Sequence, residues 1–525
     1  MLKVRLILPC RTARQYQTGL PLHGYYKIIV KTYLPSDGSS SPNNFEHLPM
    51  INIQNIDRND LTICAPSTAQ GGAIGVIRVS GAKAFNIVDG IFSPVSKKHL
   101  ADIPAGTCSF GRITDKSGEL IDEVIVSIFH APHSYTGENV VEISCHGSSY
   151  ILNKVLELLL QGGCTMALPG EFTKRAFLNG KMDLSQAEAV ADLISSTTQA
   201  NHRMAMKQMR GDYSKKIVEL RDKLLHITSM LELELDFSDH EELEFADRTE
   251  ILSWATEAQQ HIDFLCHSFK LGNVLKKGLP VAIIGETNAG KSTLLNALIN
   301  ENRALVSDIQ GTTRDTIEEC INMDGTLVRF IDTAGIRETN DLVEQMGIER
   351  TYDKIKEAEI VMWVFDATRF QEQYDELAST LMPYLADKKL IIVQNKMDLL
   401  EEERVEALAQ ETKHHNAESS LAIQICAHAE ADISRLKQLL LNTVSSIISK
   451  ESSSDVIVSN ARHYESLSLA SESLRRVVEG IKSNLSGDFI SQDLRECIYH
   501  LGEIVGKISS DDVLHNIFSK FCIGK

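Results

Sequence analysis

A glycine-rich segment between an apolar run and a helical stretch constrains this chain most. It reads Gly285-Glu-Thr-Asn-Ala-Gly-Lys-Ser292, follows Val281-Ala-Ile-Ile284 and precedes Thr293–Ile299. Its glycines allow backbone N–H groups to curl around phosphates, and the positive end of a helix adds a favourable field. We expect Lys291 to reach the β- and γ-phosphates and the Ser292 hydroxyl to ligate magnesium. The segment therefore predicts a P-loop domain.

Three further motifs follow the P-loop, and one of them identifies the base. Asn395-Lys-Met-Asp398 follows the apolar run Leu390–Val393, about 100 residues after the P-loop. An Asp carboxylate can accept two hydrogen bonds from guanine, whereas adenine offers no such pair of donors. Between these motifs lie Gly311-Thr-Thr-Arg-Asp315, with a threonine available for magnesium, and Asp332-Thr-Ala-Gly335, whose glycine amide can sense a γ-phosphate. In this order the four elements predict a GTPase of the translation-factor-like class.

Two groups that accelerate hydrolysis in many GTPases are not evident. Ile336 stands where Ras-like proteins carry a water-orienting glutamine, and the sequence does not show the source of an arginine finger. Such a finger contributes about 10³–10⁵ in rate. Asn288 is a candidate ligand for a monovalent cation lying along the phosphates, which would substitute for that positive charge. A loop-stabilising asparagine is the alternative interpretation of this residue.

Composition excludes several classes of protein. The chain has 525 residues, 43% of them apolar and 24% charged, so most of it is folded and two to four domains are expected. No apolar run approaches the roughly 18 residues that span a bilayer. The net charge of −18 argues against a surface that grips nucleic acid everywhere, though not against a local basic patch. Ten cysteines without a Cys-x-x-Cys pair favour a reduced, cytoplasmic compartment over a disulfide or zinc scaffold.

The secondary-structure pattern changes along the chain. Short strand-like runs at 75–79, 123–129 and 140–144, with a helix near 150–160, predict an α+β domain over 50–180. Helical periodicity follows, beginning at a capping box in Asp183-Leu-Ser-Gln186, and it returns near the C-terminus. Between the helical parts, strands and helices alternate. We therefore predict an α/β P-loop G domain (276–449) inserted into an all-α helical domain (181–275 and 450–525), preceded by the α+β N-terminal domain.

Residues 1–49 have a different composition. Up to Leu34 they contain six Lys or Arg and no Asp or Glu, and Met50 opens a cleaner start. Transit peptides are basic in this way, but they are also amphipathic and Ser-rich, which 20–34 is not. A dispensable extension or a mis-assigned start is the favoured interpretation. A transit peptide to an organellar matrix and a functional tail are the alternatives.

Longer segments resemble one family. The C-terminus Phe521-Cys-Ile-Gly-Lys525 and the run Val343-Glu-Gln-Met-Gly-Ile-Glu349, together with the P-loop and Gly311–Asp315, resemble the MnmE (TrmE) family of tRNA wobble-uridine-modifying GTPases. The runs Gly75–Gly81, Tyr135–Glu138 and Pro169–Asn179 resemble the N-terminal part of the same family. The resemblance extends from about residue 60 to the end.

The resemblance implies a potassium-activated GTPase whose two G domains meet across a homodimer. Potassium would be held by Asn288, Ser307, Ile309 and Thr312, and magnesium by Ser292 and Thr313. Glu344 would orient the attacking water, and Lys291 would act with it in catalysis. The GTP-binding residues implied by the motifs and the resemblance are Asn288, Ala289, Gly290, Lys291, Ser292, Thr293, Ser307, Asp308, Ile309, Gln310, Gly311, Thr312, Thr313, Asp332, Thr333, Ala334, Gly335, Asn395, Lys396, Met397, Asp398, Cys426, Ala427 and His428.

The resemblance also implies a reduced folate, 5-formyl- or 5,10-methylene-tetrahydrofolate, that supplies a one-carbon unit. Arg78, Glu142, Lys181 and Lys525 are the matching positions. Cys522 would lie near the modification chemistry, either as a nucleophile or as an incidental cysteine. A flavin-dependent MnmG (GidA) partner would form a heterotetramer with the homodimer. Together they would add a carboxymethylaminomethyl or aminomethyl group at C5 of uridine 34 in certain tRNAs.

Two other classes of GTPase compete with this interpretation. A ribosome-assembly or other RNA-docking GTPase usually appends a basic RNA-binding module, such as a KH domain, and the helical tail after Lys450 shows no Gly-x-x-Gly loop in a basic context. A membrane-remodelling GTPase would need an amphipathic insertion element, which we do not find, so no membrane partner is expected. One departure concerns the base site: Cys426-Ala-His428 stands where the family usually has Ser-Ala.

Overall fold

The computed structural model describes residues 58–69, 71–236, 248–286, 288–300, 319–323, 325–331, 355–401, 403–408, 421–451 and 456–524. The interpretations of residues 1–49 concern positions outside these ranges. Within the described ranges, no helix is long and apolar enough to cross a membrane.

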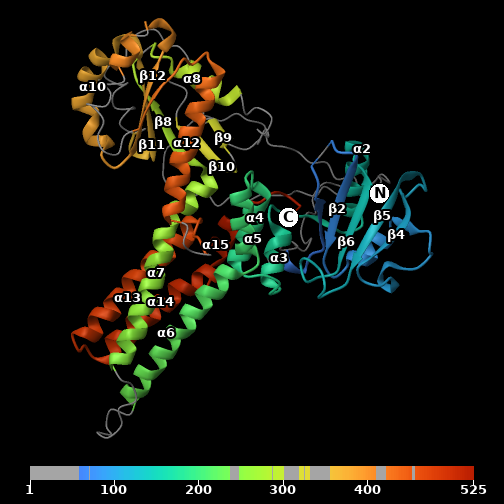
Figure 1. Cartoon of the computed structure of the whole chain (residues 1–525). Coiled ribbons are helices and arrows are strands. Elements are labelled where there is room, and N and C mark those ends of the chain that lie inside the picture. The colour runs from blue at the N-terminus through green and yellow to red at the C-terminus, as the bar shows by residue number, and fades with distance from the viewer. Residues whose placement is uncertain are drawn as a thin grey trace, which may run out of the picture. The chain divides into compact units, whose positions relative to one another are not determined.

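A seven-stranded sheet forms the N-terminal part, in the order β3-β4-β5-β6-β2-β1-β7 (Figure 1). Its neighbours pair antiparallel, except for β7, which runs parallel to β1. The helices α1 (Ala84–Asp89) and α2 (Ser149–Gln161) contribute buried side chains to its core. The strands are β1 (Ile63–Pro66), β2 (Ile74–Ser80), β3 (Phe92–Pro94), β4 (Thr107–Thr114), β5 (Leu120–Phe129), β6 (Val140–His146) and β7 (Thr165–Met166).

The three predicted strands and the predicted helix of this part are confirmed as β2, β5, β6 and α2. The strands β1, β3, β4 and β7 were not predicted. β7 has two residues and β3 has three, too few to show an alternating pattern. On β4, alternation is present, but it is carried partly by Ser109 and Gly111, which are not apolar markers.

The helical part is assembled from two distant chain segments. The first holds α3 (Glu171–Leu178), α4 (Leu184–Ser195), α5 (Gln199–Met209), α6 (Asp212–Asp236) and α7 (Arg248–Lys277). The second holds α13 (Ala461–Lys482), α14 (Gly487–Val505) and α15 (Asp511–Phe518). The predicted capping box is confirmed, because the Asp183 carboxylate accepts from Gln186 N–H and the Gln186 side chain accepts from Asp183 N–H.

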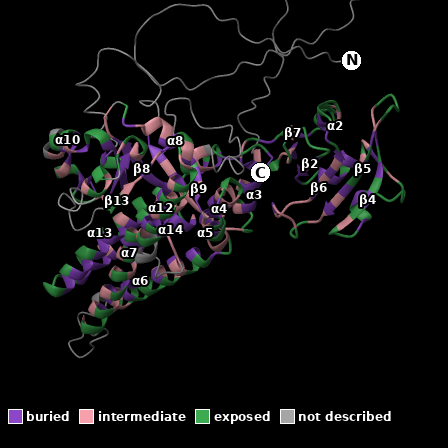
Figure 2. Ribbon diagram, turned by 45° about the horizontal axis from the view of Figure 1, so that its top comes forward, coloured by how far each residue is buried: buried purple, intermediate pink, exposed green. Residues whose placement is uncertain are grey.

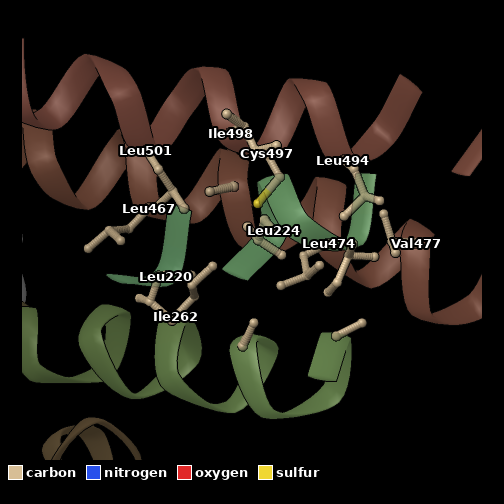
Figure 3. Close-up of a cluster of buried hydrophobic side chains, with 14 of the residues drawn as sticks. Leu220, Leu224, Ile262, Leu467, Leu474, Val477, Leu494, Cys497, Ile498 and Leu501 are labelled. Carbon is tan, nitrogen blue, oxygen red and sulfur yellow. The ribbon is translucent and has the colours of Figure 1, made fainter. Parts of the chain in front are cut away.

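The helices α6, α7, α13 and α14 share one apolar core (Figure 3). Leu220 and Leu224 from α6 meet Leu474 from α13 and Leu494 and Leu501 from α14, all at most 2% exposed. In Figure 2 these helices are buried where they face one another and exposed outside. The core therefore closes only when residues from both chain segments are present.

A six-stranded sheet lies between the two helical segments in the chain, in the order β13-β12-β11-β8-β10-β9. All pairs are parallel except β9 with β10. Its elements are β8 (Leu279–Ile284), α8 (Lys291–Asn300), β9 (Glu319–Met323), β10 (Thr326–Ile331), β11 (Ile360–Asp366), α10 (Phe370–Leu385), β12 (Lys389–Asn395), β13 (Leu421–Gln424) and α12 (Glu430–Glu451). The predicted fold class, an α/β domain inserted into a helical one, is confirmed.

The strand order positions the nucleotide site. From β8 the chain continues to β9 and β10 on one side of β8 and later returns to β11 on the other side. In open α/β sheets, ligands bind outside the carboxyl ends of the strands at such a switch point. The P-loop follows β8 at this position. Separate apolar clusters, one with α8 and α12 and one with α10, cover the two faces of the sheet.

A buried ionic cluster joins α4 to the second helical segment. The Glu188 carboxylate accepts from Arg462 at 2.9 Å and contacts His463 Nε2 at 2.6 Å. Glu188 lies within α4, and Arg462 and His463 lie in the first turn of α13. Arg462 also donates to the carbonyls of Glu503 and Ile504 at the end of α14. Burial disfavours the charge of Glu188, but His463 and Arg462 outweigh burial and lower its pKa to about 2.

The shared core predicts the effect of a cavity. Leu474→Ala removes a fully buried side chain of α13 and should lower the free energy of unfolding by about 2–5 kcal/mol. Leu469→Ala, on the same helix but 41% exposed, should cost far less. Urea unfolding followed by circular dichroism measures both. Equal midpoints for the two variants would contradict this assignment of the core.

The ionic cluster predicts a pH dependence. The pKa of Glu188 is depressed in the folded state, so its stabilisation is present above the ordinary value of 4.5 and is lost as pH falls towards 2. Glu188→Gln should therefore be less stable than wild type near neutral pH, and the gap should narrow by about 1–2 kcal/mol between roughly pH 6.5 and pH 3.5. Glu472→Gln, an exposed change on α13, should show no such narrowing in urea titrations.

Candidate functional site

The P-loop has the backbone that its sequence predicts. Gly285 has φ +144°, and a Cβ there would lie 2.1 Å from the Val364 carbonyl of the neighbouring strand β11. Only glycine fits, because the loop leaves β8 directly against that strand. Asn288 is also left-handed, with φ +67°. Lys291, the first residue of α8, donates from Nζ to the carbonyls of Gly285 and Glu286 at 2.8 and 2.6 Å, so its ammonium lies inside the loop.

Asn395 connects three of the sequence motifs. Its Nδ2 donates to the Ala289 carbonyl of the P-loop at 2.9 Å, and its Oδ1 accepts from Ala427 N–H at 3.0 Å. Asn395 is 2% exposed, so both hydrogen bonds are shielded from water. The P-loop and the segments 395–398 and 426–428 are thereby held together at one end of the sheet.

Lys396 is positioned by a partner that was not predicted, Asp366. Lys396 is left-handed, with φ +66°, and donates to the Asp366 carboxylate at 2.7 Å. Burial opposes the charge of Asp366, but hydrogen bonds from Lys396 and from Thr368 lower its pKa. The signal available in the sequence was the position of Asp366, at the carboxyl end of the apolar strand β11.

Cys426 stands where the family usually has a serine, and its thiol, like a serine hydroxyl, can donate a hydrogen bond. Burial, followed by hydrogen bonding to and repulsion from the Asp398 carboxylate, raises the pKa of the Cys426 thiol. The thiol therefore faces the carboxylate expected to bind guanine, as a serine hydroxyl could. The Cys426 N–H donates to the Asp432 carboxylate at 2.7 Å, so an aspartate side chain helps to shape this loop.

The remaining predicted residues of the nucleotide site lie outside the described residues. They are Ser307, Asp308, Ile309, Gln310, Gly311, Thr312, Thr313, Asp332, Thr333, Ala334, Gly335 and Glu344. Their predicted roles stay predictions. The potassium set keeps one described member, Asn288, and the magnesium set keeps Ser292.

Arg78 and Glu142 lie opposite each other on β2 and β6. Arg78 donates to the Glu142 carboxylate at 2.8 Å, and its guanidinium also lies over the Tyr135 and Phe172 rings, 5.2 and 5.5 Å from their centroids. The sequence analysis named neither aromatic residue as a site residue, although both belong to runs that carry the resemblance. Two charged groups beside two aromatic rings can bind a flat heterocycle that bears hydrogen-bond donors and a carboxylate.

Lys181, which follows α3, contacts the loop that also holds Tyr135. Its Nζ donates to the Pro132 carbonyl at 3.0 Å. Tyr135 in turn is hydrogen bonded to Thr173 Oγ1 at 2.9 Å, and burial raises the pKa of its hydroxyl. Lys181 and Arg78 therefore approach the loop 130–139 from two different elements.

A buried ionic network supports this region and was missed. Arg175, 2% exposed, donates to the Glu138 carboxylate at 3.0 Å and to Glu171 at 3.3 Å. Glu171 also accepts from Arg58 at 3.0 Å. The i, i+4 spacing of Glu171 and Arg175 was the available signal, but that spacing is as common on solvated helix faces.

The C-terminus returns to the end of β1. The carbonyl of Gly524 accepts from Ser67 Oγ at 3.2 Å, and a Cβ on Gly524 would lie 2.0 Å from the Pro66 carbonyl. In the sheet, Ala65 of β1 pairs with Arg78. Cys522 has an exposed side chain, and its carbonyl accepts from Gly170 N–H at 3.4 Å. Gly524 therefore lies at the end of β1, the strand that pairs with the Arg78 strand β2. Lys525 lies outside the described residues.

Comparison with known proteins places the chain in a family. A family model described as "MnmE helical domain" matches residues 184–522, and one described as "GTP-binding protein TrmE N-terminus" matches 62–181. The protein named tRNA modification GTPase MnmE of Bacteroides thetaiotaomicron is 54% identical over 468 residues, which cover 89% of this chain and 100% of that protein. The protein of the same name from Flavobacterium johnsoniae is 48% identical over 471 residues, covering 89% and 100%.

Solved structures match less well. The crystal structure of Era in complex with MgGDPNP and a fragment of 16S ribosomal RNA is 24% identical, with a TM-score of 0.25, and covers 37% of this chain and 66% of that chain. A match at this level adds nothing to the assignment. The two family models and the near-full-length identities show that the chain belongs to the MnmE (TrmE) family of tRNA modification GTPases.

Proposed function

We propose that this chain binds and hydrolyses GTP and acts with a flavin-dependent MnmG (GidA) partner on certain tRNAs. The pair would add a carboxymethylaminomethyl or aminomethyl group at C5 of the wobble uridine 34. The observation that carries this proposal is the identity of 54% over the full length of a protein named tRNA modification GTPase MnmE. The hydrogen bonds by which Asn395 joins the P-loop to the base-recognition segments support GTP as the nucleotide.

In the nucleotide site, Lys291 would neutralise the β- and γ-phosphates, and Ser292 with Thr313 would hold Mg²⁺. The Asp398 carboxylate would accept from the guanine base. Asn288, Ser307, Ile309 and Thr312 would hold K⁺, which would stabilise charge developing between the β- and γ-phosphates. Glu344 would orient the attacking water. The left-handed backbone of Asn288 supports its proposed role as a K⁺ ligand, because this conformation turns the P-loop at a residue with a polar side chain.

In the N-terminal site, a reduced folate, 5-formyl- or 5,10-methylene-tetrahydrofolate, would bring the one-carbon unit. The pterin ring would pair with Glu142 and lie beside Tyr135, while Arg78, Lys181 and Lys525 would attract the glutamate tail. The contacts among Arg78, Glu142 and the two aromatic rings support this proposal. Cys522 would be close to the chemistry because its neighbour Gly524 lies at the end of β1.

The assembly would be a homodimer that joins MnmG in a heterotetramer in the cytoplasm. The proposed domains are 50–180 for folate binding and dimerisation, 276–449 for GTP, and 181–275 with 450–525 for the helical domain that joins them. Residues 1–49 would be dispensable. The alternative is an RNA-docking regulatory GTPase that modifies no nucleoside.

Asn395 provides a test of the base site. Asn395→Ala leaves the Ala289 carbonyl and the Ala427 N–H buried without this partner, which should weaken GDP and GTP binding by about 10-fold or more. Asn395→Asp keeps the acceptor for Ala427 N–H but sets a buried carboxylate oxygen against the Ala289 carbonyl, so it should weaken binding as well. Titration with a fluorescent guanine nucleotide measures both variants. An unchanged affinity in Asn395→Ala would contradict the proposed arrangement.

Replacing potassium by sodium tests the cation proposal. GTP turnover should fall by about 10-fold or more when K⁺ is exchanged for Na⁺ at equal ionic strength, because a poorly fitting ion stabilises less charge in the transition state. Asn288→Ala should be slow in both salts, whereas wild type should be slow only in sodium. Equal wild-type rates in the two salts would refute potassium activation and would leave the GTPase assignment unchanged.

Deletion of the gene tests the tRNA role. Mass spectrometry of wobble nucleosides should show loss of the C5-modified uridines, restored by the wild-type gene. A strain complemented with Cys522→Ser would report on that residue separately. Unchanged modified uridines after deletion, with no second copy of the gene, would favour the RNA-docking alternative.

A further inference from the structure

The helix α5 is a basic segment in an acidic protein. From Leu193 to Gly211 the chain contains no Asp or Glu, while Arg203, Lys207 and Arg210 all fall within it. The whole chain holds 71 acidic against 53 basic residues, so its net charge is negative, whereas the net charge of this stretch is positive. No residue of this stretch is assigned to the GTP site or to the folate site.

The three basic residues share one face of α5. Asn201, Ala205 and Gln208 are buried on the opposite face. Asn201 Nδ2 donates to the Lys276 carbonyl at 3.4 Å, and Gln208 Nε2 donates to the Ser185 carbonyl at 2.9 Å, so α5 is held against α7 and α4. The residues at 203, 207 and 210 follow the i, i+4, i+7 spacing of a single face and therefore point away from the anchored side. Figure 2 shows α5 within the helical part of the molecule.

A hollow of about 220 Å³ opens beside this face. Arg203 and Lys207 line it from α5, and its apolar walls come from Ala200, Met204, Leu275 and Ile457. The space suits a planar ring of the size of a nucleobase, with two cations at its edge. Asp212 also lines the hollow and opposes an anion, but the two cations Arg203 and Lys207 outnumber this one carboxylate among the lining residues.

We propose that the basic face of α5 and this hollow form an RNA-docking surface, in which Arg203, Lys207 and Arg210 contact phosphates and one unstacked base enters the hollow. Single-stranded RNA is bound by this combination of a basic track and a surface for a base. An acidic protein surface would be attracted by the same cations, and the tests below separate that alternative. RNA is favoured as the occupant because the near-full-length relatives are named tRNA modification GTPases. The identity of the RNA as tRNA rests on the proposed function.

The first test measures binding of bulk tRNA by fluorescence anisotropy over a range of salt concentrations. The variant is Arg203→Gln/Lys207→Gln, and the matched control is Arg475→Gln/Lys482→Gln. The control residues are exposed on α13 among the acidic residues Glu472 and Glu479. Each lost phosphate contact lowers the slope of log K against log salt by about 0.7–0.9, so the α5 variant should lower the slope by about 1.4–1.8. The control should keep the wild-type slope.

The charge-preserving pair Arg203→Lys/Lys207→Arg separates charge from folding. It should keep the salt slope of wild type, because counterion release depends on charge and not on side-chain shape. An α5 Gln variant with an unchanged slope, or a control variant that loses as much, would overturn the proposal. So would a wild-type protein that retains no tRNA at about 50 mM salt.

Ala200→Phe tests the hollow. It fills the space without changing charge and should weaken tRNA binding by about 5-fold or more at an unchanged salt slope, the lower end of the loss of one base contact. An unchanged affinity would refute the part of the proposal that concerns the hollow. If the Gln variant keeps tRNA binding but loses binding to purified MnmG, the surface contacts protein and the proposal is wrong.

GTP turnover of the same preparations separates this inference from the proposed function. If wild type hydrolyses no GTP but binds tRNA with the predicted dependence on Arg203 and Lys207, the GTPase proposal fails and the RNA surface stands. If GTP is hydrolysed and the variants bind tRNA like wild type, the RNA surface fails and the GTPase proposal stands.

Discussion

Glu188 and Arg462 are 274 residues apart in the chain, yet their side chains form a buried ion pair that also includes His463. The pair joins the first helical segment, before the α/β insertion, to the first turn of the helix that follows it. Breaking one partner of such a pair leaves an uncompensated charge and costs about 3–5 kcal/mol. Because Arg462 also donates to the last carbonyls of α14, three helices depend on one guanidinium. The insertion can therefore leave and re-enter the helical domain without dividing its core.

The nucleotide site depends on a smaller interaction of the same kind. Asn395 holds the P-loop and the Cys426–His428 loop with one donor and one acceptor, both shielded from water. The parallel strands β8, β12 and β13 deliver these loops to the same edge of the sheet. Lys396 and Asp366 extend the arrangement to β11. Burial and then the Asp398 carboxylate raise the pKa of the Cys426 thiol, which stands where the family usually has a serine.

The C-terminal residues show how packing can supply a site with groups from elsewhere. Leu514, Phe518 and Phe521 share an apolar cluster with Leu184 and Ala187 of α4. This cluster holds α15 against the start of the helical domain and leads the chain to the end of β1, where Gly524 contacts Pro66. Cys522, whose side chain is exposed, is two residues from this contact with β1, and β1 pairs with β2, the strand of Arg78. An apolar contact between the chain's two distant parts is what brings these polar groups together.

The sequence alone was sufficient for the P-loop, the guanine motif, the three-part fold class and the capping box at Asp183, because each depends on local spacing. The P-loop, for example, is recognised from its glycines, its lysine and the apolar run before it. All of these lie within about ten residues of one another. The short strands β3 and β7 were not, since two or three residues carry no periodicity. Tertiary structure alone decided the partners of Glu188, Asn395, Arg175 and Gly524. Their contacts join residues from 4 to 457 positions apart, and only packing of the complete chain determines which buried charge or carbonyl each one meets.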